Sequence, residues 1–158
     1  MPSQEPPVLT REQLIAALNE DLSREYQAII AYVNYSQVLK GAAYQFIAGE
    51  LEKHAHEELQ HALTIANQID YLGGDPTVIP KAVKTSSKAT DMLQFDLDNE
   101  NETVKNYRIR VRQAEALGEY AVAENIRTIL VQEQDHQNDL ATALGVDVPD
   151  VTKPDEIA

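Results

Sequence analysis

The sequence predicts an all-α protein, a four-helix bundle in which one long crossover joins the second and third helices. Apolar residues recur at helical spacing in four long segments, and a glycine follows each segment. The break at residues 73–87 is long and contains Pro76 and Pro80, so we interpret it as a crossover and not as a tight turn. With 158 residues, 43% of them hydrophobic, the chain can bury the core of one domain.

The helix boundaries follow from capping and glycine signals. Thr10 followed by Gln13 predicts an N-cap with a capping box, and a first helix over residues 11–40. The apolar positions of the second helix include Phe46 and Leu59, and Gly145 ends the fourth helix. The remaining helices are expected over residues 42–72, 87–117 and 119–144. We expect one bundle domain over residues 11–145, with short termini at 1–10 and 146–158.

Composition excludes several classes of function. The chain has no cysteine, so any metal must be held by Glu, Asp and His, which favours iron or manganese over structural zinc. The net charge of -13 would repel DNA and anionic lipid. The sequence has no apolar run of 18 residues, and its first seven residues lack the features of a secretory signal. We therefore expect a cytoplasmic protein that has no nucleic-acid or membrane partner.

A pattern of possible metal ligands occurs twice. Each copy has a glutamate, a tyrosine seven residues later, and a Glu-x-x-His motif that starts 33 residues after the first glutamate. The copies are Glu25, Tyr32, Glu58 and His61, then Glu100, Tyr107, Glu133 and His136. Helical residues three apart differ by about 60° around the axis, so the Glu and His of each motif can reach one interior space. The pattern predicts a carboxylate-bridged two-metal site near the middle of the bundle.

The alternative is that these residues are ordinary charges on solvated helix faces. With 15 glutamates and 4 histidines in the chain, about 0.4 Glu-x-x-His matches are expected by chance. One motif would mean little, but two with the same upstream glutamate and tyrosine are a much rarer coincidence. Ala28, Ile29 and Tyr32 also follow Glu25, and an unpaired carboxylate on such an apolar face would be costly to bury. The repeat therefore favours a metal site.

The segments LNEDLSRE (18–25), ELQHA (58–62), DLDNE (96–100) with KNYR (105–108), and EQDH (133–136) resemble the ferritin-like di-iron superfamily. The bacterioferritin pattern is the most similar, over about residues 11–144. The resemblance implies that Glu58 and Glu133 bridge two iron ions. It implies that Glu25 and His61 complete one ion, and that Glu100 and His136 complete the other. Such ligands also accept manganese or zinc.

Four further residues are expected around the centre. Tyr32 and Tyr107 are expected to hydrogen-bond the terminal glutamates, and Tyr32 is included among the catalytic residues as a source of an electron. Simple core filling is the alternative for both tyrosines. Glu57 and Gln132 resemble the family positions that bind the outer nitrogen of the opposite histidine, although Gln132 replaces the usual acidic residue.

The other two histidines are excluded from the metal ligands. His54 lies one turn before Glu58, and we expect it at the surface or the core edge, with a role in metal entry as the alternative. His56 is expected on another face of the same helix.

Departures from the family patterns narrow the expectation. Leu59 occupies the position of the methionine that binds haem in bacterioferritins, so no haem is expected. Residues 146–158 include Pro149 and Pro154, and are too short and broken for the fifth helix of a 24-subunit cage. A homo-oligomer is expected, and a dodecamer or a simple dimer stays open. Thr103 stands where rubrerythrin-like peroxidases carry an additional ligand glutamate.

The first hypothesis for function is a ferroxidase, which oxidises Fe(II) with O2 for iron storage or detoxification. The alternative is a rubrerythrin-like di-iron or di-manganese oxidase or peroxidase that acts on peroxide or a small organic substrate. A non-catalytic helical interaction module is the third. The expected partners are Fe(II) with O2 or H2O2.

Overall fold

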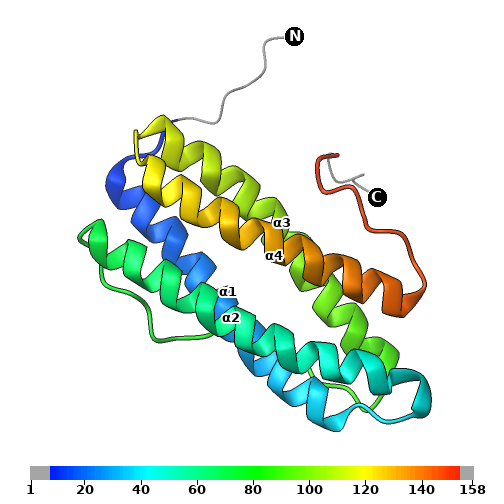
Figure 1. Cartoon of the computed structure of the whole chain (residues 1–158). Helices are drawn as coiled ribbons and strands as arrows, with labels where there is room; N and C mark the ends of the chain where they lie inside the picture. Colours follow the sequence, from blue (N-terminus) through cyan, green and yellow to red (C-terminus); the bar gives the residue numbers. More distant parts are fainter. Residues whose placement is uncertain (1–7, 154–158) are drawn as a thin grey trace.

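The computed structural model describes residues 8–153 and is all-α over that range (Figure 1). Its elements are α1 (Arg11–Val38), a 3-10 turn η1 (Ala42–Tyr44), α2 (Gln45–Tyr71), α3 (Ala89–Ala116) and α4 (Tyr120–Leu144). The predicted four-helix class is confirmed. The expectations for the termini fall partly on residues 1–7 and 154–158, which lie outside the described range. Between residues 8 and 153, no helix combines the length and hydropathy needed to cross a bilayer.

The helix ends follow their local sequence. The Thr10 hydroxyl accepts the Gln13 backbone N–H at 3.1 Å, and the Gln13 side chain accepts the Thr10 N–H at 2.9 Å, which confirms the predicted capping box. The second helix begins at Gln45 and not at residue 42, because the intervening residues form the 3-10 turn. Gly145, with φ of 70°, ends α4 in the left-handed conformation that glycine adopts without strain.

Contacts of Arg11 show how the helices are directed. Its Nε donates to the Leu72 carbonyl at 2.9 Å, and its guanidinium pairs with Glu119 at 2.9 Å. The start of α1 therefore lies near the end of α2 and the α3–α4 connection. We call this half of the bundle the Arg11 end, and the half that holds the α1–α2 connection the Gly41 end. Helices α1 and α4 run from the Arg11 end to the Gly41 end, and α2 and α3 run in the opposite direction (Figure 1).

The segment between α2 and α3 follows α1. Asn19, Ser23 and Gln27 lie four residues apart on α1, and their side chains donate to the carbonyls of residues 75, 79 and 82 at 3.0, 2.8 and 2.7 Å. Further along α1, the Tyr35 hydroxyl donates to the Lys84 carbonyl. These contacts lead the chain from the Arg11 end to the Gly41 end, where α3 begins. They explain how two consecutive helices can run parallel.

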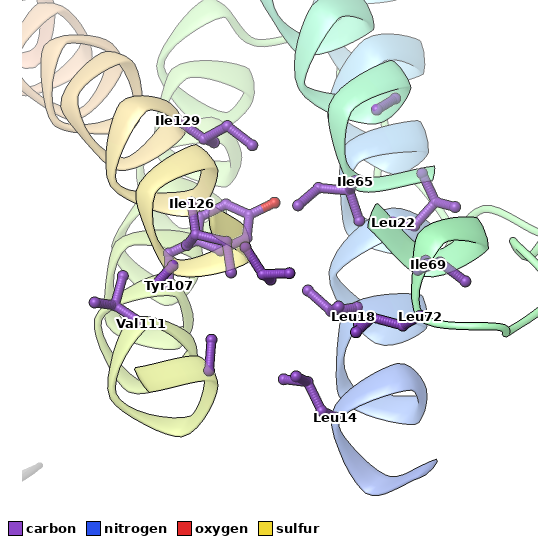
Figure 2. Close-up of a cluster of buried hydrophobic side chains, with 14 residues drawn as sticks. Leu14, Leu18, Leu22, Ile65, Ile69, Leu72, Tyr107, Val111, Ile126 and Ile129 are labelled. Atoms are coloured by element: carbon purple, nitrogen blue, oxygen red, sulfur yellow. The ribbon is translucent and has the colours of Figure 1, made fainter. Parts of the chain in front are cut away.

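Apolar clusters fill both ends of the bundle. The cluster at the Arg11 end includes Leu14, Leu18, Ile65, Ile69, Tyr107, Ile126 and Ile129 (Figure 2). The cluster at the Gly41 end includes Tyr32, Tyr35, Ile47, Leu51, Leu93, Leu97 and Leu140. Phe46 and Leu59, counted above among the apolar positions of the second helix, are 80% and 46% exposed. The buried face of α2 is instead formed by Ile47, Leu51 and the polar residues His54 and Glu58.

Candidate metal centre

The six predicted ligand positions meet between the two apolar clusters. Each antiparallel pair of neighbouring helices supplies half of them, because equal spacing from the helix starts places them at one level of the bundle. None of the six residues is more than 3% exposed. They are Glu25 on α1, Glu58 and His61 on α2, Glu100 on α3, and Glu133 and His136 on α4.

One group of four surrounds the His61 ring. Its Nδ1 lies 2.9 Å from Glu58 Oε2, 2.9 Å from Glu133 Oε1 and 3.7 Å from Glu25 Oε2. All four residues can offer a ligand atom within 4.8 Å of the others. Because a metal-bound nitrogen or oxygen lies about 2.1 Å from its ion, ligands around one ion are about 3 to 4 Å apart. This group could hold one metal ion.

The second group mirrors the first around His136. Its Nδ1 lies 2.8 Å from Glu58 Oε1, 3.5 Å from Glu133 Oε2 and 3.7 Å from Glu100 Oε1. These four residues also offer ligand atoms within 4.8 Å of one another. Glu58 and Glu133 belong to both groups, and each turns one oxygen toward each histidine. The arrangement could therefore hold two ions with two carboxylates between them.

The outer nitrogens of both histidines have acceptors. His61 Nε2 lies 2.6 Å from Gln132 Oε1, and His136 Nε2 lies 3.1 Å from Glu57 Oε2. Each acceptor comes from the helix opposite its histidine, as the resemblance implied. An acceptor at Nε2 favours the tautomer that carries its proton there, which turns the Nδ1 lone pair toward the carboxylates. The amide of Gln132 serves in this way as well as a carboxylate does, but without its charge.

The two tyrosines bind the terminal glutamates across helices. The Tyr32 hydroxyl on α1 donates to Glu100 Oε1 on α3 at 2.5 Å, and the Tyr107 hydroxyl on α3 donates to Glu25 Oε1 on α1. Burial raises the pKa of both tyrosines well above 10, and the nearby carboxylates raise it further. Both hydroxyls therefore remain protonated donors at neutral pH.

Protons balance the cluster when no metal is bound. Burial and then the Glu133 charge raise the pKa of Glu100 to about 7, and burial with Glu58 and Glu133 raises the pKa of Glu25 well above its usual value. Burial alone would lower the pKa of the two histidines, but contacts with the carboxylates raise it far above its usual value. Metal ions must displace these protons, because only deprotonated carboxylates and neutral imidazoles are ligands.

The donor set fits a pair of divalent ions. Buried oxygens of all four glutamates make no hydrogen bond, and the close contacts of His136 Nδ1 lack hydrogen-bond geometry. Unsatisfied buried polar atoms are costly and call for a partner such as an ion. Four carboxylates and two neutral imidazoles carry a charge of about -4, which two divalent ions would balance. Oxygen and nitrogen donors of this kind suit iron, manganese and zinc.

Two buried aspartates next to the centre were missed from the sequence. Asp21 and Asp96 lie four residues before Glu25 and Glu100, so the 75-residue repeat extends to them and could have identified both. Asp21 forms a two-pronged ion pair with Arg110, at 2.7 Å from Nε and 3.0 Å from a terminal nitrogen. Asp96 is 2% exposed, and its Oδ2 makes no hydrogen bond. Burial raises its pKa well above the usual value.

The prediction of a surface or core-edge position for His54 is wrong. The residue is 2% exposed, and its Nε2 lies 3.0 Å from Asp139 Oδ2. Its ring stacks on the ring of His136, with centroids 4.0 Å apart and planes 25° apart, while Tyr32 meets it edge-on at 5.1 Å. Burial and then His136 lower the pKa of His54, so it is neutral at neutral pH. His56 is exposed on another face, as expected.

Comparison with known proteins followed from this geometry. A sequence model described as a ferritin-like domain matches residues 15–147. The chain is 27% identical over 127 residues to the bacterioferritin of Desulfovibrio desulfuricans, covering 80% of this chain and 71% of that protein. It is 26% identical over 133 residues to the bacterioferritin of Streptomyces coelicolor, covering 84% of this chain and 80% of that protein.

Two solved structures share the fold. A ferritin-like di-iron carboxylate protein from Bacillus anthracis superposes with a TM-score of 0.81 at 34% sequence identity, covering 85% of this chain and 96% of that chain. A bacterioferritin-related protein from Bacteroides fragilis, described as a dodecameric thioferritin, superposes with a TM-score of 0.80 at 28% identity. That match covers 87% of this chain and 88% of the other.

Proposed function

Because the chain belongs to the ferritin-like domain family, we propose that it is a non-haem di-iron protein that oxidises Fe(II) with O2, a ferroxidase serving iron storage or detoxification. The observation that carries this proposal is the pair of four-residue groups that share Glu58 and Glu133. Shared carboxylates allow two ions to act on one O2 molecule, and each Fe(II) supplies one electron.

Each residue has a distinct part in the proposed reaction. Glu58 and Glu133 bridge the two ions, Glu25 and His61 hold one, and Glu100 and His136 hold the other. The hydrogen bonds from Gln132 and Glu57 fix the orientation of the histidine rings. Tyr32 fixes the Glu100 carboxylate and stands close enough to the centre to supply an electron.

The comparisons support the proposal at the level of the family. Two relatives are bacterioferritins and one structural neighbour is a di-iron carboxylate protein, which favours iron as the substrate metal. One neighbour is described as dodecameric, which supports a homo-oligomer for this chain also. We further propose a cytoplasmic location.

The test combines oxidation with storage. Anaerobic protein is given Fe(II), O2 is admitted, and O2 consumption is followed together with the iron that remains bound after size-exclusion chromatography. We expect rapid O2 consumption, and iron retained well beyond two ions per chain in an assembly larger than a dimer. A dimer that oxidises two ions and retains no more would overturn the storage role.

The alternative reaction is distinguished in the same preparation. A peroxidase would consume H2O2 in the presence of Fe(II) much faster than it consumes O2, and an oxidase would convert an added organic reductant with little net storage. A protein that binds no metal under any of these conditions would leave only the helical interaction module. The Glu102→Gln variant, which changes an exposed carboxylate, serves as the control.

A further inference from the structure

A third group of ligand-type residues lies at the Gly41 end, outside the paired centre. Glu50 and His54 are one turn apart on α2, and Asp139 on α4 lies one turn beyond His136. Each of the three can offer a ligand atom within 4.8 Å of the other two. The closest approach is 3.0 Å, between His54 Nε2 and Asp139 Oδ2.

Their donor chemistry suits a divalent ion. One imidazole and two carboxylates are the donor types that hold iron, manganese, cobalt or zinc, with water completing the shell. Ligands on opposite sides of one ion are about 4 Å apart, so the observed spread needs only small side-chain rotations. Lys53 holds Glu50 Oε1 at 2.6 Å, which leaves Oε2 of the same carboxylate for an ion.

The group has access to water. A cavity of about 140 Å³ between the start of α2 and the end of α4 is lined by both Glu50 and Asp139, with Tyr44 and Phe46 on its α2 side. His54 lies buried beneath these carboxylates. An ion entering the cavity would therefore meet the two carboxylates first and the imidazole behind them.

Burial of His54 is the second observation that indicates a ligand. Its Nδ1 is buried and has no hydrogen-bond partner, so the ring is held in the interior without being fully satisfied. Packing does not require a histidine there. The position 75 residues later, in the same place relative to Glu133, is Ile129, which fills the Arg11 end as an apolar side chain.

The geometry points to a third divalent-cation site at Glu50, His54 and Asp139, which loads the His136 side of the paired centre. The step from cavity to centre is short, because the His54 ring stacks directly on the His136 ring. Binding at the third site stands on its own residues, while the loading role rests on the proposed function of the pair.

Cobalt(II) is the probe for this proposal, since it binds the same donors and does not consume O2 as Fe(II) does. Anomalous diffraction and equilibrium binding count the ions per chain, and stopped-flow absorbance follows their uptake. We expect three Co(II) per chain in the natural sequence, and two in the Glu50→Gln, Asp139→Asn double variant. Because local carboxylates raise cation on-rates at least tenfold, loading of the pair should slow by about tenfold in that variant.

The matched control is the Asp70→Asn, Glu102→Gln double variant, which removes two exposed carboxylates and the same net charge. It should bind three ions and load as fast as the natural sequence. Equal slowing in the control, or no slowing in the Glu50 and Asp139 variant, would overturn the loading role. Two ions at the pair and none at the third group would overturn the third site. One ion at the third group and none at the pair would instead overturn the proposed function.

Discussion

The two ends of the bundle are related by the 75-residue repeat, yet they differ in how they neutralise buried charge. At the Arg11 end, Asp21 is paired with Arg110 by two hydrogen bonds. At the Gly41 end, the equivalent Asp96 has no arginine, because the position that corresponds to Arg110 is Tyr35. The Tyr35 hydroxyl is directed to the crossover carbonyl of Lys84.

The ends also differ in what separates the centre from water. His54, Glu50 and Asp139 correspond to Ile129, Asn125 and Thr64 at the other end. The Arg11 end is closed by a layer of leucine and isoleucine side chains (Figure 2). The Gly41 end has a polar column that leads to a cavity. The comparison shows that the ligand layer has kept the symmetry of the repeat while the two ends have diverged, one for closure and one for access.

The largest effect is expected where the two halves cannot be told apart. Glu58→Ala and Glu133→Ala each remove a carboxylate that both groups share, so each should abolish the paired site and lower O2-dependent Fe(II) oxidation by about a hundredfold or more. Stopped-flow oxidation with metal counts would measure this. Paired oxidation that survives either change would show that the ligand assignment is wrong.

Arg110→Met should break the closed end. It leaves Asp21 buried without a partner, at a cost of about 3 to 5 kcal/mol in the free energy of unfolding. Tyr35→Phe at the equivalent position loses one hydrogen bond and should cost about 1 kcal/mol. Urea titration of metal-free protein measures both. The Asp21→Asn, Arg110→Met double variant should recover most of the loss, and failure to recover would mean that packing and not charge dominates there.

The pH dependence of metal-free protein should reveal the charge stored in the centre. The pKa of Glu100 rises from 4.5 to about 7 on folding, so its contribution is fully present below 4.5 and is lost as the pH rises through 7. This amounts to about 3 kcal/mol between pH 5 and pH 8. Thermal melting across that range should show the decline, and Glu100→Gln should flatten it.

Added Zn(II) should reverse this trend, since deprotonated ligands bind metal more tightly. The gain in melting temperature from Zn(II) should therefore grow between pH 5 and pH 8. A metal-free midpoint that stays level over this range in the natural sequence would contradict the assigned charge state of the centre.

The smallest effects are expected at the tyrosines. Tyr32→Phe and Tyr107→Phe each remove one hydrogen bond to a terminal glutamate, which corresponds to about tenfold in rate at most. We expect about tenfold slower oxidation for Tyr32→Phe and about threefold for Tyr107→Phe, because the Tyr32 ring also contacts His54 and His136. Single-turnover oxidation under air would measure the difference. Equal rates in the two variants would show that the polar end gives Tyr32 no special part.

Repetition explains what the sequence could predict. The four helices and the convergence of six side chains followed from spacing that occurs twice, which separates a built arrangement from isolated charges. The role of the six residues in metal binding stays a prediction. Asp21 and Asp96 share the same offset and were within reach of this argument.

Features without a counterpart in the repeat could not be predicted in the same way. His54 and Asp139 have apolar or uncharged equivalents, so each read as a single polar residue on a helix, where exposure is the usual outcome. The exposure of Phe46 and Leu59 was hidden for a related reason. The interior face of α2 is polar at its centre, so apolar letters do not mark that face alone.

The different acceptors of the two histidines have an electronic consequence. A carboxylate at Nε2 makes an imidazole a stronger electron donor than an amide does. Because His136 is bound by Glu57 and His61 by Gln132, the ion beside His136 would have the lower reduction potential of the two. The first electron should then leave from the side of the bundle that opens to the cavity, and a half-oxidised centre would hold its valences in a fixed order.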